Sequence, residues 1–316
     1  MPSGRSASPS IEVRGPIAIM QSTQTRLTYV AAISALLIWS GTAVANKIAN
    51  RYLGGLSVGV LRSMVAGFAA LLVVLVLGYR LPSSGRQRGL LVLSGLCSFV
   101  LWPVFMSVGI QHTTVGDATV IMALIPILTV LVGSAAQRRA PALSWWLGAS
   151  LAFAGGVLLL VHRGLFLPAV VEGVSLRGDL WVLLGAVLCA IGYASGARVA
   201  QEIGTMATTF LGLTISLPLL APIFLLCTPL RGLQRLPLEF WSAVAWMALM
   251  SSLVGYGLWF FALSRGGIAR IATLQLAMPV FGLAFAALLL QESITDYLGL
   301  ACLIILSGVY IAQRKA

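Results

Sequence analysis

The stretch SVGVLRSMVAGFAALLVVLVLGY, residues 57–79, contains a single charged side chain, Arg62, in an otherwise apolar run. An α-helix of roughly 20 residues crosses the ~30 Å hydrocarbon core of a membrane, and this stretch is long enough to do so. A helix on the surface of a soluble protein would instead show a polar face with a helical period. Residues 57–79 are therefore typical of a transmembrane helix.

Similar apolar blocks recur along the whole chain and are separated mostly by short connections. Hydrophobic residues make up 59% of the 316 residues and charged residues only 9%, whereas soluble domains carry about 25% charged residues. So few charges could not cover a water-soluble fold, and we expect an all-α polytopic membrane protein with ten transmembrane helices. The expected spans are 27–46, 57–79, 89–110, 114–136, 144–162, 179–198, 207–228, 238–262, 268–290 and 294–312.

The net charge of +12 does not indicate nucleic-acid binding. Lys and Arg occur singly or in pairs between the apolar blocks and form no basic face. If the N-terminus is cytoplasmic, roughly twice as many of these cations fall inside as outside, in agreement with the positive-inside rule. We therefore expect a multi-pass protein of the bacterial cytoplasmic (inner) membrane with both termini in the cytoplasm. The four cysteines lie singly within apolar blocks, so neither a metal site nor a cofactor is expected.

The second half of the chain repeats the first at a nearly constant offset. Pro126 corresponds to Pro279, and Ser98 corresponds to Ser251. Each half has an odd number of spans, so the second half enters the membrane from the opposite side. Such inverted repeats are common in secondary transporters, whose substrate site lies near the midplane between the halves. The expected organisation is a disordered cytoplasmic tail (1–26), a first repeat (27–162), an external linker (163–178) and a second repeat (179–312).

Several short motifs occur in a fixed order along these repeats. They are WSGTAVANK at residues 39–47, Leu61-Arg62, ALIP at 123–126, LAMP at 276–279 and LQE at 290–292. In this order and spacing they resemble the EamA-type branch of the drug/metabolite transporter (DMT) superfamily, whose members have ten spans in two five-span repeats. The resemblance implies transport of an amino acid or related small metabolite by alternating access, with export as the expected direction. The chain departs from the family pattern at Arg139, which stands at the first-repeat position that corresponds to Glu292.

Polar and aromatic residues recur on one face of several expected spans. Stripes on repeat-related helices could line a substrate cavity. The alternative is helix packing, since small polar side chains also bond between helices and aromatic stripes are often core. Gln275 lies one turn before Pro279, where a proline frees a backbone carbonyl. The candidate substrate-binding residues are Trp39, Thr42, Asn46, Ser98, Trp102, Tyr193, Ser252, Tyr256, Trp259 and Gln275.

Prolines and the few charged residues near span ends point to kinks and to a gate. Pro126 and Pro279 should kink the fourth helix of each repeat. Arg62 is expected to snorkel toward the membrane interface, where pairing with Asp117 would form an external gate or a folding contact. No carboxylate lies at the centre of an expected span, so a coupled mechanism would not use a midplane acid.

Other functions fit these residues less well. An intramembrane protease needs a catalytic constellation, but Ser195 lacks the full nucleophile motif and His112 and His162 lie at span ends. A channel would show polar or charged pore-lining rings. A flippase or accessory membrane subunit for a lipid-linked metabolite stays an alternative. The expected partners are a small-molecule substrate, membrane lipid and a second copy in a homodimer, with no nucleic acid.

Overall fold

The computed structural model describes residues 16–110, 112, 121–162, 176–228, 232–278, 280–281 and 296–314. Within these residues every regular element is a helix, and five segments are long and apolar enough to cross a membrane. The expected all-α membrane fold is confirmed. The elements are α1 (Pro16–Ala49), α2 (Gly55–Leu77), α3 (Gly85–Gly95), η1 (Leu96–Leu101), α4 (Trp102–Ile110), α6 (Ile125–Gln137), α7 (Leu143–His162), α8 (Leu176–Ile203), α9 (Thr205–Cys227), η2 (Leu233–Arg235), α10 (Leu238–Ala245), η3 (Trp246–Gly255), α11 (Tyr256–Gly266), α12 (Ile268–Leu274), η4 (Gln275–Ala277) and α14 (Asp296–Gln313).

Helix α1 is longer than the apolar pattern indicates. It begins at Pro16, inside the expected disordered tail of residues 1–26, which is a correction to that expectation. Proline suits the first turn of a helix, because the N–H that it lacks would have no partner there. The following Ile17-Ala18-Ile19-Met20 contains no helix breaker, so nothing in the sequence stops the helix before the membrane span.

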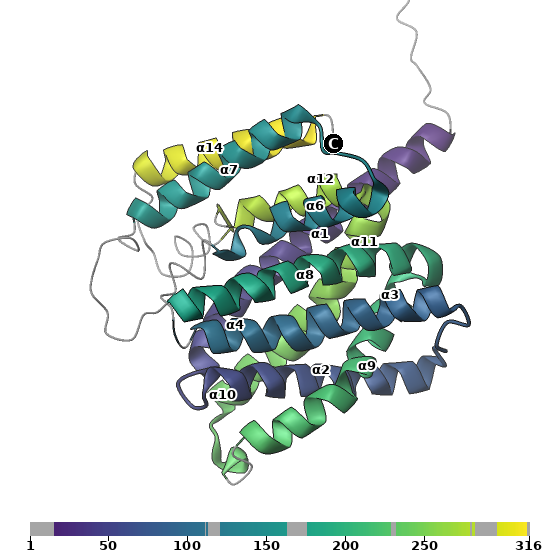
Figure 1. Cartoon of the computed structure of the whole chain (residues 1–316), viewed down its shortest axis with the longest axis vertical. Coiled ribbons are helices and arrows are strands. Elements are labelled where there is room, and N and C mark those ends of the chain that lie inside the picture. The colour runs from purple at the N-terminus through teal and green to yellow at the C-terminus, as the bar shows by residue number, and fades with distance from the viewer. Residues whose placement is uncertain are drawn as a thin grey trace, which may run out of the picture.

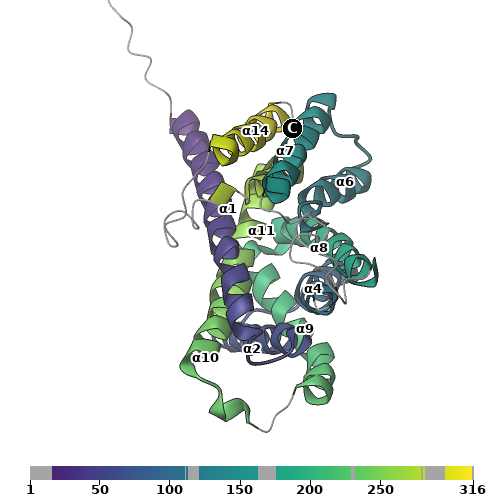
Figure 2. The same ribbon diagram turned by 90° about the vertical axis from the view of Figure 1, so that its left-hand side faces the viewer.

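Helices from the two halves pack against each other in pairs (Figure 1). Helix α2 packs on α9, α6 on α12 and α7 on α14, and in each pair the two helices are counterparts in the two halves. Helix α1 packs on α11, and α8 packs on α4. Because α8 is the counterpart of α1 and α4 is the counterpart of α11, these two contacts are equivalent in the two halves. Figure 2 shows α1 running along α10 and α11 at one side of the molecule. This is the pairing that a two-fold axis between the halves produces.

Glycines allow the close approach of α7 and α14 and show that this pair is antiparallel. A methyl group added at Gly308 of α14 would meet the Gly148 carbonyl oxygen of α7 at 2.6 Å, and one added at Gly155 would meet Ile305 at 2.9 Å. The contacts therefore run in opposite directions along the two helices. Small residues of this kind let helix backbones pack closely in a membrane.

The third helix of each half contains a π-helical segment. Segment η1 joins α3 to α4, and η3 joins α10 to α11. The offset that relates Ser98 to Ser251 places η1 within η3. The third helix of each half therefore has its wider, π-helical turns at the same position in the repeat. The hydroxyl of Ser252 donates to the Met247 carbonyl at 2.9 Å, five residues earlier. Segments of this kind are rare and often mark functional sites.

Two ion pairs join the halves at opposite faces of the molecule. Arg86 lies 3.3 Å from Glu202, and Arg51 lies 3.7 Å from Glu239. In the repeat alignment Arg86 corresponds to Glu239 and Arg51 to Glu202, so the two pairs are counterparts with their charges exchanged. The Tyr52 hydroxyl also donates to Glu239 at 2.9 Å, and this bond raises the pKa of Tyr52. We call the face that carries Arg86 the N-terminal face, because α1 begins there, and the other the opposite face.

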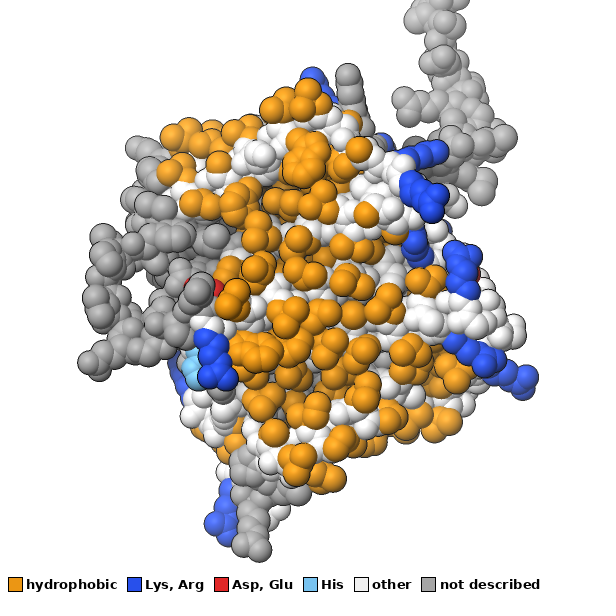
Figure 3. Space-filling view, viewed as in Figure 1, with side chains coloured by type: hydrophobic (Ala, Val, Ile, Leu, Met, Phe, Trp, Pro, Cys, Tyr) orange, Lys and Arg blue, Asp and Glu red, His pale blue; other side chains and the backbone are white. Residues whose placement is uncertain are grey.

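Hydrophobic side chains cover most of the surface between these two faces. Figure 3 shows them spread over the helices, while Lys and Arg side chains gather at the edges, mostly at the N-terminal face. Large apolar residues such as Val76 and Leu226 are 82% and 85% exposed. An apolar belt between charged edges is the surface that a bilayer requires.

Candidate functional site

Four aromatic residues that the sequence pattern singles out meet in the interior. Trp39 of α1 stacks on Tyr193 of α8 with ring centres 6.0 Å apart. It also contacts Tyr256 and Trp259 of α11, each at 5.3 Å. All four residues are at most 9% exposed. These rings, which we call the aromatic cluster, come from α1 in the first half and from α8 and α11 in the second, so the cluster lies where the halves meet.

Hydrogen bonds tie the aromatic cluster to the two π-helical segments. Trp39 Nε1 donates to the Ser251 carbonyl in η3 at 3.1 Å. The Tyr256 hydroxyl donates to the Ser98 carbonyl in η1 at 3.2 Å. A π-helical turn shifts the backbone bonding pattern, so its carbonyls can accept bonds from side chains. The repeat-related serines therefore supply the anchor points of the cluster.

Arg62 of α2 is buried beside the aromatic cluster. The residue is 6% exposed, and its guanidinium lies within electrostatic range of the Tyr193 and Tyr256 phenols. Within the described residues, its Nε has no hydrogen-bond partner. The expectation that Arg62 snorkels is wrong, because Arg62 sits about 10 Å along α2 from Gly55, on the buried face of the helix. Asp117, its expected gate partner, lies outside the described residues.

Other interior polar atoms also lack hydrogen-bond partners in the described part of the chain. They include Ser98 Oγ, Trp259 Nε1 and Gln275 Oε1. Ser98 and Trp259 are fully buried, and both adjoin the rings of the aromatic cluster. Buried polar groups without partners are uncommon because each costs the desolvation free energy of the group. Ser98 Oγ and Trp259 Nε1 both lie at the aromatic cluster, where a polar solute could satisfy them.

The remaining candidate residues contribute mainly to helix packing. A methyl group added at Gly185 of α8 would meet the Trp102 ring at 3.2 Å, so this ring packs on α8. Thr42 donates to a carbonyl one turn earlier in α1 at 3.2 Å, and Asn46 is half-buried one turn further on. The hydroxyl of Ser252 is likewise satisfied within its own helix.

Pro126 lies at the start of a helix in the structure. Helix α6 begins at Ile125, and a turn at Ala123-Leu124 precedes it. The N–H that proline lacks therefore costs no hydrogen bond. At the corresponding level of the second half, α12 tightens into the 3-10 turn η4. Pro279 lies outside the described residues.

Two contributors to the site escape sequence reasoning. Phe99 and Phe260 contact Tyr256 with ring centres 4.7 Å and 5.9 Å apart. Each is the chain neighbour of a candidate, since Phe99 follows Ser98 and Phe260 follows Trp259. A search for aromatic residues next to the repeat-related stripes would have found them.

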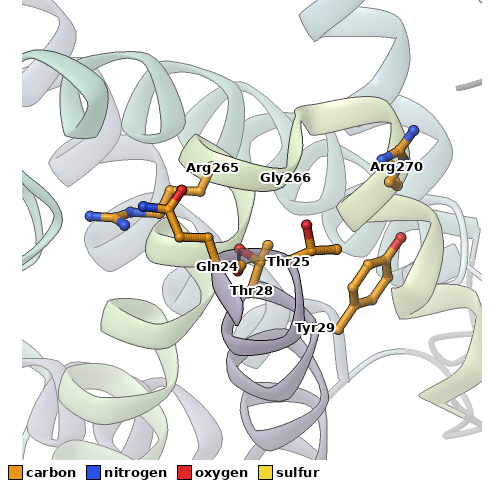
Figure 4. A pocket seen from close by; sticks show the side chains of 7 residues that line it. All are labelled: Gln24, Thr25, Thr28, Tyr29, Arg265, Gly266 and Arg270. Carbon is orange, nitrogen blue, oxygen red and sulfur yellow. Dashed lines mark hydrogen bonds between the residues drawn. The ribbon is translucent and has the colours of Figure 1, made fainter. Parts of the chain in front are cut away.

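Two pockets open at the N-terminal face, away from the aromatic cluster. One of about 520 Å³ includes Arg86 and Glu202 in its wall. Figure 4 shows the other, of about 500 Å³, between residues 24–29 of α1 and the junction of α11 with α12. Trp39 lies about 17 Å deeper along α1 than Thr28 of this second pocket. The second pocket is lined by Gln24, Thr25, Thr28, Tyr29, Arg265, Gly266 and Arg270.

Comparisons with known proteins agree with this arrangement. The model of the EamA-like transporter family matches residues 26–161 and again residues 176–313. The uncharacterized transporter YdeK of Bacillus subtilis (strain 168) is 29% identical over 89% of this chain and 95% of its own. A "Probable amino-acid metabolite efflux pump" of Escherichia coli (strain K12) is 26% identical over 89% of this chain and 93% of its own. A crystal structure of another protein, 20% identical, shares the fold with a TM-score of 0.71 over 90% of this chain and 96% of that one.

Two matches to one family model identify the halves as copies of the same repeat. The relatives are named as transporters and metabolite efflux pumps, and the apolar helices are those of a multi-pass membrane protein. The chain therefore belongs to the EamA-like transporter family of the drug/metabolite transporter superfamily, and it is an integral membrane transporter rather than an enzyme.

Proposed function

We propose that this protein is a secondary transporter that exports an amino acid or a related small metabolite across the bacterial cytoplasmic membrane by alternating access. The observation that carries the proposal is the aromatic cluster, with the buried Arg62 beside it, at the contact between antiparallel halves. A site between inverted repeats can face either side of the membrane when the halves rock.

The proposed moving bodies are the two repeats, residues 27–162 and 179–312, each crossing the membrane five times. The N-terminal face is proposed to be cytoplasmic. Cations such as Arg265 and Arg270 line a pocket at that face, and this supports the orientation because cytoplasmic segments are enriched in Lys and Arg. Segment 163–178 would then lie outside the cell.

The proposed substrate class rests on two kinds of support. Relatives in Escherichia coli and Salmonella typhimurium are named as probable amino-acid metabolite efflux pumps. The candidate site also combines aromatic rings with unpartnered polar atoms, such as Ser98 Oγ and Trp259 Nε1. Sites for small metabolites typically combine apolar walls with a few placed polar groups.

Counterflow in proteoliposomes tests the proposal. Vesicles that contain the purified protein are loaded with one unlabelled amino acid at a time, and entry of the labelled compound is followed. A carrier accumulates label transiently, whereas a channel does not. We expect counterflow for at least one amino acid or close derivative, together with loss of activity in a well-expressed Trp39→Ala variant. Absence of counterflow across the panel, with movement of a lipid-linked metabolite instead, would favour the flippase alternative.

A further inference from the structure

We propose that Arg62 binds the carboxylate of the transported solute at the aromatic cluster, a step that rests on the proposed transport function. Arg62 is 6% exposed and has an unpartnered Nε among the described residues. A guanidinium stays charged at any physiological pH, so a buried one needs an anion nearby.

The described side chains around Arg62 supply no such anion. In that part of the chain, the titratable groups that act on its guanidinium are the phenols of Tyr256 and Tyr193. Phenols are neutral near pH 7. The carboxylates of Glu202 and Glu239 are engaged at the two faces of the molecule, with Arg86 and Arg51 respectively. A carboxylate brought in by the solute would complete the site.

The guanidinium geometry and the charge balance favour a carboxylate. Arginine presents planar N–H donors that match the two oxygens of a carboxylate or a phosphate. A phosphate monoester carries about two negative charges at neutral pH, so it would leave an uncompensated charge beside the single Arg62. A carboxylate carries one negative charge, which matches the single positive charge of Arg62.

Neighbouring groups fit the rest of such a solute. Trp259 Nε1 is a buried donor without a partner in the described chain, and Ser98 Oγ is also unpartnered. The rings of Trp39 and Tyr193 stack on each other in the observed arrangement. Because these two rings belong to different halves, rocking of the halves would separate them and admit a side chain between apolar walls.

Matched acids and amides test the assignment on the full-length protein. The probes are the common amino acids and their primary amides, which differ only in the group that Arg62 would bind. Binding to the detergent-purified protein is measured by equilibrium dialysis and by quenching of tryptophan fluorescence. We expect the tightest-binding acid to bind about tenfold to hundredfold more tightly than its amide. Equal binding of acid and amide, or no binding of any acid, would overturn the assignment.

Three variants place that preference on Arg62. Arg62→Gln should reduce the affinity for the acid to that for the amide, while Arg62→Lys should keep part of the preference because it keeps the charge. The matched control is Arg80→Gln, since Arg80 is an exposed arginine between α2 and α3 and its loss should leave the preference for the acid unchanged. If Arg62→Gln prefers the acid over the amide as strongly as the native protein does, the proposal is contradicted. If that variant does not fold, judged by gel filtration, Arg62→Lys and the acid–amide comparison in the native protein still decide.

Counterflow measured in parallel separates this assignment from the proposed transport function. An amide that exchanges as fast as its acid would overturn the Arg62 site and leave the transporter proposal standing. Acid-selective binding without counterflow of any probe would leave the Arg62 site standing and overturn the transporter proposal. The protein would then bind the solute without carrying it.

Discussion

Trp39 is a first-half side chain that contacts three aromatic residues of the second half. It makes three ring contacts and one hydrogen bond, all to residues of α8, η3 or α11. Aromatic pairs of this kind are each worth about 0.5–1.5 kcal/mol beyond the area that they bury. A residue so placed stabilises the closed contact between the halves and also lines any cavity that forms when they part.

Replacing Trp39 by Ala should therefore lower both stability and transport. We expect a loss of about 3–5 kcal/mol of stability, as for other buried aromatic truncations, and at least a tenfold loss of counterflow. Trp39→Phe keeps a ring but lacks the bond to the Ser251 carbonyl, so its loss should be closer to 1 kcal/mol.

The control for this prediction is Trp146→Ala, because Trp146 on α7 is 42% exposed and its ring contacts Trp145 instead of the cluster. Thermal unfolding and counterflow are measured on all three variants at matched expression. Equal effects of Trp39→Ala and Trp146→Ala would show that the ring contacts at Trp39 have no special role.

The aromatic residues could be predicted from sequence, but the position of Arg62 could not. Tyr256 and Trp259 lie at helical spacing on the eighth expected span, whose repeat counterpart is the third, and Trp39 begins a similar stripe on the first span. The structure brings these three rings together. Arg62 reads as a cation near a span end, where snorkelling is the usual outcome. Its burial depends on which face of α2 meets the neighbouring helices, and a uniformly apolar span carries little information about its faces.

At the scale of elements, the bilayer makes helix positions predictable. The expected spans 57–79 and 207–228 match α2 (Gly55–Leu77) and α9 (Thr205–Cys227) within a few residues, because a fixed hydrocarbon thickness sets the length of each apolar block. The breaks inside helices are harder to predict. The π-helical segments η1 and η3 contain apolar residues like those of the surrounding helix, so composition does not mark them.

The α7–α14 contact should be sensitive to a single methyl group. A Cβ at Gly308 would meet the backbone of both Gly148 and Ala152, so Gly308→Ala must push the helices apart. Overpacking of this kind typically costs about 1–3 kcal/mol, and we expect the melting temperature to fall by about 5 °C. Gly299→Ala on the same helix is the control, since nothing lies within 4 Å of its added methyl group. A fluorescence-based melting assay in detergent compares the two, and similar values for both would refute the close packing.

At the scale of the whole molecule, the antiparallel halves predict which loops face which side. In a variant without native cysteines, Ser83→Cys lies between α2 and α3 at the N-terminal face, and Asn50→Cys lies after α1 at the opposite face. With the N-terminal face in the cytoplasm, a membrane-impermeant maleimide should label Asn50→Cys in intact cells and Ser83→Cys only after permeabilisation. The reverse pattern would invert the orientation, and labelling of both from one side would contradict the alternating crossings.

The two repeat-related ion pairs predict opposite effects on the direction in which the molecule opens. Arg86–Glu202 holds the α3–α8 contact at one face, and its counterpart Arg51–Glu239 holds the α1–α10 contact at the other. Arg86→Glu or Arg51→Glu places like charges across the respective contact. Because exposed pairs contribute about 0.2–1 kcal/mol, each reversal should shift the balance of conformations by up to about fivefold.

The readout is the rate at which an impermeant thiol reagent, added from the opposite face, labels Thr42→Cys beside the aromatic cluster. Arg51→Glu should raise this rate by loosening the opposite face, whereas Arg86→Glu should lower it by favouring the state open at the N-terminal face. Restoring each pair with Glu239→Arg or Glu202→Arg should return the rate to that of the parent protein, which separates the ion-pair contact from net charge. Two reversals that move the rate in the same direction would mean that the paired halves do not open alternately about the cluster.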